Sequence, residues 1–188
     1  MRIISGKFKG RKILEPPDIK TRPLKDLTKE SIFNIIEHTN KFKINLTKSN
    51  ILDLFSGVGS FGIECLSRGA NYVVFVENYF GVLPILKKNL ISLGSLKNYK
   101  VIEKDVYDKS LFIKFDNKFN LIFFDPPYKD KNFIKILINM QKLNLLDKDG
   151  IIILHRHKKE KDNFPENFKI IEEKKYGISK IFFLNFLN

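Results

Sequence analysis

The chain has 188 residues, of which 43% are hydrophobic, a length and composition suited to one domain with a full core. Its apolar stretches are shorter than a membrane span, and its first residues lack the apolar run of a signal peptide. One cysteine, Cys65, excludes an intrachain disulfide and a cysteine-rich zinc site, and its helical setting favours core packing over a nucleophile. We therefore expect a cytoplasmic protein.

The formal net charge is +13, which predicts a polyanionic partner and most simply nucleic acid. Three of the five arginines fall within the first 22 residues, and arginine makes bidentate phosphate contacts that lysine does not. The candidate RNA-binding residues are Arg2, Lys7, Lys9, Arg11, Lys12 and Arg22.

Residues 1–23 are predicted to form a short basic hairpin, because apolar segments at 3–4 and 12–14 flank Gly6 and Gly10 and a Pro-Pro pair follows. Two interpretations of this unit stay open. It is either a solvated edge that frays or an arm that grips RNA. Residues 24–188 form the second unit.

Hydrophobic periodicity predicts helices and strands that alternate along this second unit. Helices are expected over 24–38, from the loop at 56–62 to about 67, and over 80–93, 107–115 and 133–143. Strands are expected over 51–55, 72–76, 99–103, 121–124 and 150–154, followed by a closing hairpin of 168–176 and 179–186. Residues 41–50 are interpreted as a polar linker. Such alternation is typical of a doubly wound α/β fold with a mostly parallel sheet.

A glycine-rich loop follows the first of these strands. Gly57, Gly59 and Gly62 match Gly-x-Gly-x-x-Gly, and Glu77 comes twenty residues after Gly57 at the end of the next strand. This pattern indicates an adenosine-containing cofactor whose ribose hydroxyls Glu77 would hold, and it does not separate a nicotinamide dinucleotide from S-adenosylmethionine. Asp53 favours the second, because its carboxylate would repel a pyrophosphate but suits a cationic amino group and sulfonium.

Asp105 follows the strand at 99–103, where a carboxylate can accept the exocyclic amine of adenine. The alternative is an ordinary loop acid or helix cap.

The chemistry is expected at Asp125-Pro-Pro-Tyr128, which follows the apolar strand 121–124. Ligands of open α/β sheets bind at the carboxyl ends of strands. Asp125 and the carbonyl of Pro126 can accept the two protons of a ring-bound NH2 group, and Tyr128 offers a face on which a base can stack. Both contacts would push the nitrogen lone pair away from the ring and toward an electrophile. The alternative is a proline-rich turn with a capping acid.

These motifs, in this order, resemble the RsmD family of bacterial methyltransferases that act on a guanine N2 of small-subunit ribosomal RNA. The resemblance covers nearly the full length, from the opening 2–12 through the loop 53–64 and the Asp-Pro-Pro-Tyr motif to 176–181. There are departures: Leu24 and Leu27 replace a hydroxyl and a basic residue, and His155 stands where a glutamate is expected.

The resemblance implies a Rossmann-like class I methyltransferase with a seven-stranded sheet, S-adenosylmethionine as cofactor and a ribosomal RNA or small-subunit substrate. It implies a monomer without metal or membrane association. The implied catalytic residues are Asp125, Pro126 and Tyr128. The implied cofactor residues are Asp53, Phe55, Gly57, Gly59, Glu77, Asp105 and Val106.

The pair His155 and His157 has no neighbouring acid or cysteine in sequence to complete a metal site, so we expect both to be solvated or to face RNA. Three functions remain as alternatives. They are methylation of adenine N6 or of a protein glutamine, a nicotinamide-dependent oxidoreductase, and a catalytically silent RNA-binding factor.

Overall fold

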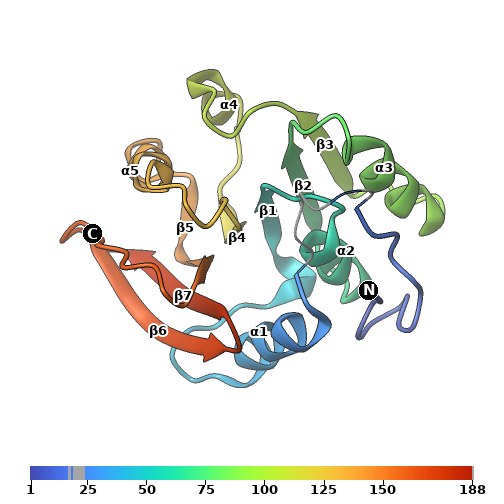
Figure 1. The fold of residues 1–188 in the computed structure, drawn as a ribbon, viewed down its shortest axis with the longest axis horizontal. Coiled ribbons are helices and arrows are strands. Elements are labelled where there is room, and N and C mark those ends of the chain that lie inside the picture. Colours follow the sequence, from blue (N-terminus) through green and yellow to red (C-terminus); the bar gives the residue numbers. More distant parts are fainter. Residues whose placement is uncertain (17, 19–23, 188) are drawn as a thin grey trace.

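The computed structural model describes residues 1–16, 18 and 24–187. They contain a seven-stranded sheet of order β3-β2-β1-β4-β5-β7-β6 (Figure 1). The strands are β1 (Asn50–Leu54), β2 (Tyr72–Glu77), β3 (Tyr99–Glu103), β4 (Phe119–Phe124), β5 (Leu146–His157), β6 (Phe168–Tyr176) and β7 (Ser179–Phe186). Strands β1 to β5 pair in parallel, and β7 runs antiparallel to both β5 and β6. The predicted doubly wound sheet with a C-terminal antiparallel hairpin is therefore confirmed.

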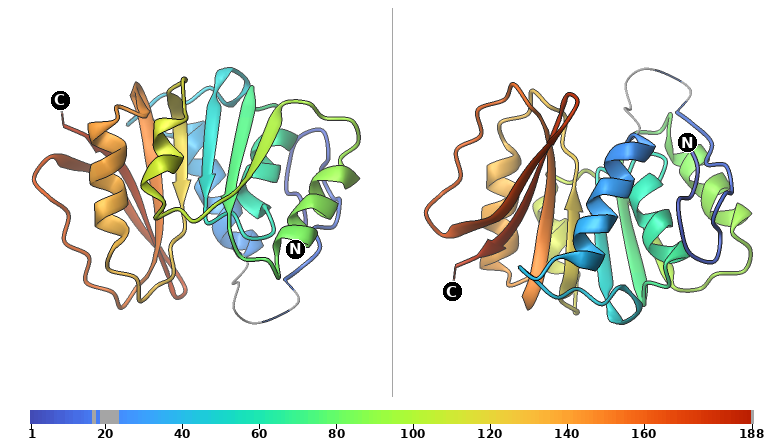
Figure 2. Two further views of the ribbon diagram at one scale, coloured as in Figure 1. Left: turned by 90° about the horizontal axis from the view of Figure 1, so that it is seen from above. Right: turned by 90° about the horizontal axis from the view of Figure 1, so that it is seen from below.

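Helices cover both faces of the sheet (Figure 2). They are α1 (Asp26–His38), α2 (Ser60–Ser67), α3 (Leu83–Ser92), α4 (Lys109–Ile113) and α5 (Phe133–Lys142). Side chains of a strand alternate between the faces, so neighbours such as Phe123 and Phe124 enter different core clusters. The cluster with α1, α2 and α3 includes Phe61, whose ring stacks on Phe123 at 4.0 Å. The other cluster holds α4 and α5.

Several element boundaries differ from the sequence-based ones. Strand β5 runs well past 150–154, because pairs such as His155–Ile181 and His157–Ser179 continue its ladder with β7. Helix α3 begins at Leu83 rather than 80, with Pro84 in its first turn as expected. Helix α4 is shorter than 107–115, because Asp108 caps it by accepting from the Ser110 N–H at 2.8 Å.

The stretch 41–50 is more than a linker. It contains a 3₁₀ turn, η1 (Leu46–Lys48), and both Phe42 and Leu46 are buried. The ring of Phe42 stacks on Phe183 of β7 at 5.6 Å between centroids. The segment therefore belongs to the core that α1 and the sheet share.

The predicted N-terminal hairpin is present as a short pairing around one antiparallel bridge, between Arg2 and Lys12. Backbone hydrogen bonds from Ile3 to the Arg11 carbonyl and from Ile13 to the Met1 carbonyl flank this bridge at 2.9 and 3.0 Å. Other N–H groups of the N-terminal segment donate to helix side chains. The N–H groups of Ile4 and Ser5 donate to the Glu64 carboxylate of α2 at 2.8 and 2.9 Å. Leu14 donates to Asn89 of α3 at 2.9 Å. The apolar side chains of the segment, Ile3, Phe8 and Ile13, are buried in the core.

The charged side chains of this segment point outward. Arg2, Lys7, Lys9, Arg11 and Lys12 are all exposed, whereas Arg22 lies outside the described residues. The segment is thus anchored by its apolar residues and backbone, and its basic groups remain on the surface.

Candidate active site

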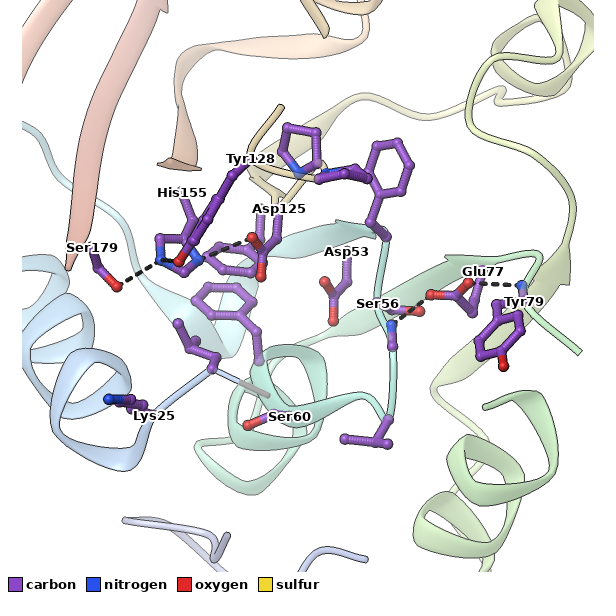
Figure 3. Close-up of a pocket in the computed structure, with 18 of the residues that line it drawn as sticks. Lys25, Asp53, Ser56, Ser60, Glu77, Tyr79, Asp125, Tyr128, His155 and Ser179 are labelled. Carbon is purple, nitrogen blue, oxygen red and sulfur yellow. Dashed lines mark hydrogen bonds and ion pairs between the residues drawn. The ribbon is translucent and has the colours of Figure 1, made fainter. Parts of the chain in front are cut away.

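A cavity of about 480 Å³ lies at the carboxyl ends of β1, β2 and β4 (Figure 3). It joins the glycine loop that follows β1 with the Asp-Pro-Pro-Tyr turn that follows β4, although some seventy residues separate them in the sequence. The predicted site residues that line it are Asp53, Phe55, Gly57, Glu77, Asp125, Pro126 and Tyr128. Its size is that of a pocket for a cofactor or small ligand.

Asp53 is held at the floor of this cavity by the start of α2. Its side chain is 1% exposed, and Oδ2 accepts the backbone N–H of Gly62 at 2.9 Å. A Cβ on Gly62 would lie 2.3 Å from the Phe75 ring and 2.9 Å from that same oxygen, so packing requires glycine there. Burial raises the pKa of Asp53 well above 3.8, and the nearby charges of Asp125 and Glu77 raise it further.

Glu77 fixes the glycine loop to the next strand. One carboxylate oxygen accepts the N–H of Gly57 at 2.7 Å, and the other accepts the N–H groups of Asn78 and Tyr79 at 2.9 Å each. Phe55 and Gly57 both adopt positive φ, +57° and +55°, so the chain turns sharply between strand and helix. The oxygen that accepts from Gly57 keeps a lone pair with which to accept a ligand hydroxyl.

Three predicted cofactor residues lie outside the lining of the cavity. Gly59, at φ +84°, allows close packing, because a Cβ there would lie 2.6 Å from Leu86 of α3. Asp105 is exposed and accepts the N–H of Tyr107 at 2.9 Å, as a loop acid does. Val106 is buried in the core. Gly59, Asp105 and Val106 stay predictions as cofactor contacts.

The Asp-Pro-Pro-Tyr turn is braced from β5 by a buried arginine. Arg156 is 1% exposed and donates to the carbonyls of Pro127 and Asp130 at 3.1 and 2.9 Å. Its Nε donates to Asp162 at 3.0 Å, and Lys180 lies 3.2 Å from the other oxygen of that carboxylate. The guanidinium also stacks over the ring of Phe133 at 4.3 Å. These contacts hold the turn in one conformation.

The expectation that His155 is solvated is wrong. It is 6% exposed and lines the cavity, and its Nδ1 lies 2.9 Å from Oδ1 of Asp125 (Figure 3). The sheet register explains the contact. Phe124 of β4 pairs with Leu154 of β5, so the residues that follow, Asp125 and His155, are neighbours. His157 is partly buried, with its ring 5.1 Å from that of Tyr128.

Sequence reasoning also missed Lys25, Ser60, Tyr79 and Ser179, which line the cavity. Lys25 precedes α1 and Ser179 opens β7, so only the folded chain brings them to the site. Ser60 lies within the glycine loop and Ser179 within the stretch 176–181, but neither motif assigns a role to these serines, and Lys25 and Tyr79 lie outside the motifs. The described residues contain no group of three or more His, Cys, Asp or Glu that could hold a metal ion. Within the same residues, no helix is both long and apolar enough to cross a membrane.

The chain is similar to known proteins over nearly its whole length. The family model described as "Conserved hypothetical protein 95" matches residues 1–185. The protein YlbH of Bacillus subtilis is 37% identical over 155 residues, which cover 81% of this chain and 80% of YlbH. Ribosomal RNA small subunit methyltransferase D of Haemophilus influenzae is 32% identical over 179 residues, which cover 95% of this chain and 90% of that protein.

A solved structure of the Escherichia coli protein yhhF matches the fold with a TM-score of 0.81 at 25% sequence identity. The match covers 98% of this chain and 96% of that chain. The class I methyltransferase fold is therefore confirmed, with the antiparallel hairpin at its C-terminal end. On these matches, the chain belongs to the RsmD/YlbH family of ribosomal RNA methyltransferases that depend on S-adenosylmethionine.

Proposed function

We propose that this protein transfers a methyl group from S-adenosylmethionine to the exocyclic N2 of a guanine in small-subunit ribosomal RNA. One observation carries the proposal. A single cavity is lined both by the glycine loop with its carboxylates and by the Asp-Pro-Pro-Tyr turn. A cofactor held on one side would therefore face an amine held on the other.

The charge of the cavity supports S-adenosylmethionine over a dinucleotide. Asp53, Glu77 and Asp125 all line it, and the pKa of Asp53 is raised in part by the other two carboxylates. A cationic ligand would relieve this repulsion, whereas a pyrophosphate would add to it. Asp53, Phe55, Gly57 and Glu77 are the residues that would hold the cofactor, with Asp105 and Val106 as further proposed contacts. When bound, S-adenosylmethionine supplies a methyl group on a sulfonium, which is an electrophile.

On the substrate side, Asp125 and the Pro126 carbonyl accept the two protons of guanine N2, and Tyr128 stacks on the base. These contacts localise the nitrogen lone pair and aim it into the cavity. The exocyclic amine is unreachable inside a helical stack, so the guanine is either extruded or already unpaired. Holding both reactants in this geometry can supply about 7–11 kcal/mol of the rate enhancement.

The RNA contacts are proposed from charge. The net charge of +13 and the exposed basic groups of the N-terminal segment suit a phosphate backbone. These groups are Arg2, Lys7, Lys9, Arg11 and Lys12, to which the sequence adds Arg22. Affinity that rests on such contacts should fall steeply as the salt concentration rises.

The proposal is tested with S-adenosylmethionine labelled in its methyl group and small subunits, or their RNA, that lack methylation. The RNA is digested and the labelled nucleoside is identified by mass spectrometry. We expect N2-methylguanosine, lost in Asp125→Ala. Label in N6-methyladenosine would keep the amino-group chemistry and refute the guanine assignment. Binding of S-adenosylmethionine without label in any RNA would point to a protein glutamine or to a silent RNA-binding factor, and binding of a nicotinamide dinucleotide instead would point to an oxidoreductase.

A further inference from the structure

We propose that His155 is the positioning residue of the methyl-transfer site, and that it donates from Nδ1 to Asp125 to fix the oxygen that faces the substrate amine. The inference rests on the proposed amino-group transfer, and it adds a residue outside the glycine loop and the Asp-Pro-Pro-Tyr motif. His155 contacts both members of the turn that would hold the base, Asp125 and Tyr128.

The environment of the imidazole sets its tautomer. Nδ1 is shielded from solvent and has no hydrogen-bond partner of suitable angle among the described residues, but it lies within ion-pair distance, 2.9 Å, of Oδ1 of Asp125. A lone pair there would face the lone pairs of a carboxylate, so the proton belongs on Nδ1. On the other side of the ring, Nε2 lies 2.8 Å from Oγ of Ser179 and 3.2 Å from Oη of Tyr128. Both hydroxyls can donate to an unprotonated Nε2.

This contact has a consequence for Asp125, whose side chain is 19% exposed and would otherwise be free to rotate in the cavity. With Oδ1 engaged by His155, the carboxylate is held in one orientation and Oδ2 remains to accept from the amine. An acceptor held in place in advance is worth more than one that must be ordered during the reaction.

The same ring positions Tyr128. The rings of His155 and Tyr128 pack edge to face, with centroids 5.5 Å apart and an interplanar angle of 89°. One side chain therefore orients both the acceptor of the amine and the aromatic face on which the base stacks. Ser179, at the start of β7, supports the ring from the adjacent strand.

Three substitutions separate the role of Nδ1 from that of packing. In asparagine the amide nitrogen is two bonds from Cβ, as Nδ1 is in histidine, so His155→Asn can keep the donor to Asp125. In His155→Gln the amide is one bond further out, near the place of Nε2, and the donor to Asp125 is lost. His155→Phe keeps a ring and removes both nitrogens. His38→Asn, at the exposed end of α1, is the matched control.

The variants are compared by the single-turnover rate of methyl transfer to RNA, together with the calorimetric affinity for S-adenosylmethionine. We expect His155→Phe and His155→Gln to lose about 10- to 100-fold in rate at unchanged cofactor affinity. His155→Asn should stay within about threefold of the wild-type protein and of His38→Asn. The proposal would be overturned if His155→Phe and His155→Gln transferred methyl groups at the wild-type rate, or if His155→Asn were as slow as His155→Phe. A thermal melt of each variant identifies any variant that fails to fold. The rates of the variants that do fold then test the proposal.

A second readout does not depend on activity. The chain has three histidines, so nitrogen NMR of its imidazoles can be assigned by comparing the wild-type protein with His155→Asn and His38→Asn. We expect His155 to carry its proton on Nδ1 at neutral pH, and an unprotonated Nδ1 would overturn the proposal. If the wild-type protein methylates an amine other than guanine N2, the rate comparison is made on that amine. The two proposals can thus fail separately.

Discussion

Arg156 donates from Nη1 to the carbonyl of Pro127 at 3.1 Å, and so ties the fifth strand to the turn on which the substrate is proposed to rest. We predict that Arg156→Met lowers the free energy of unfolding by about 3 kcal/mol, because it removes two hydrogen bonds to the turn and leaves the buried carboxylate of Asp162 with one cation fewer. The rate of transfer should also fall, since the turn loosens. Urea denaturation and a transfer assay measure the two effects, and full activity in a destabilised variant would show that the turn needs no brace.

Gly62 is predicted to be intolerant of even one added methyl group. In Gly62→Ala the new Cβ would meet the ring of Phe75 and a carboxylate oxygen of Asp53, so α2 must shift away from the cavity. We expect a loss of about 1–3 kcal/mol in stability and weaker binding of S-adenosylmethionine. Gly94→Ala is the control: it has φ +90° and no heavy atom within 4 Å of the added Cβ, so it should cost stability and leave cofactor affinity unchanged. If both variants bound S-adenosylmethionine equally well, the close packing at Gly62 would not be needed for the cofactor site.

The ionisation of Asp53 predicts opposite effects on stability and on binding. Its folded-state pKa is raised well above 3.8, so the native protein retains a proton that the unfolded chain has released. The free energy of unfolding therefore decreases as pH rises from 3.8 through the folded pKa of this group. Asp53→Asn should be the more stable protein above that range, and the difference should shrink toward pH 3.8.

Ionisation of Asp53, which lowers the stability of the fold, should strengthen the binding of S-adenosylmethionine. A cationic cofactor favours the ionised carboxylate, so affinity for S-adenosylmethionine should increase with pH in the wild-type protein. Asp53→Asn should bind about 10- to 100-fold more weakly and lose that pH dependence. Calorimetric titrations across the range test both statements. A variant that binds as tightly as the wild type would remove Asp53 from the cofactor site.

Glu64 is predicted to hold the N-terminal segment in place. Its buried carboxylate accepts from Ile4 and Ser5, lies 3.6 Å from Nζ of Lys29 and pairs with Arg68 at 2.9 Å. Glu64→Ala leaves Lys29 buried with a reduced set of partners, and we expect a loss of about 3–5 kcal/mol. Trypsin should then cleave the released segment at its basic residues well before the rest of the chain. Unchanged resistance to trypsin would mean that the apolar residues alone anchor it.

Much of the fold follows from local pattern. Apolar strands such as 51–54 and 121–124 alternate with amphipathic helices, and alternation of this kind nearly determines a doubly wound sheet. The ends of elements depend on tertiary partners, which pattern does not contain. Strand β5 continues to His157 because β7 pairs with it, and the N-terminal hairpin stays short while Glu64 and Asn89 accept the N–H groups of Ile4 and Leu14.

The site residues that belong to a sequence motif were predicted. The residues that reach the site through strand register or helix packing were missed. Asp53 lies within a predicted strand, Glu77, Asp125 and Tyr128 follow predicted strands, and the cavity brings all four together. His155 lies outside the catalytic motifs. It is next to Asp125 because Phe124 pairs with Leu154, so the contact can be predicted only when the register between β4 and β5 is known. Lys25 and Ser179 reach the cavity only through the packing of α1 and β7.

The most direct test of the account asks whether the N2 amine itself receives the methyl group. Once the labelled nucleotide has been mapped, an RNA fragment is prepared with inosine in place of that guanosine, which removes the amine and leaves the rest of the base. Transfer from labelled S-adenosylmethionine is then measured on both fragments. The account predicts label on the guanosine fragment and none on the inosine fragment. Equal label on both would place the methyl group on another atom and contradict the proposed roles of Asp125, Pro126 and Tyr128.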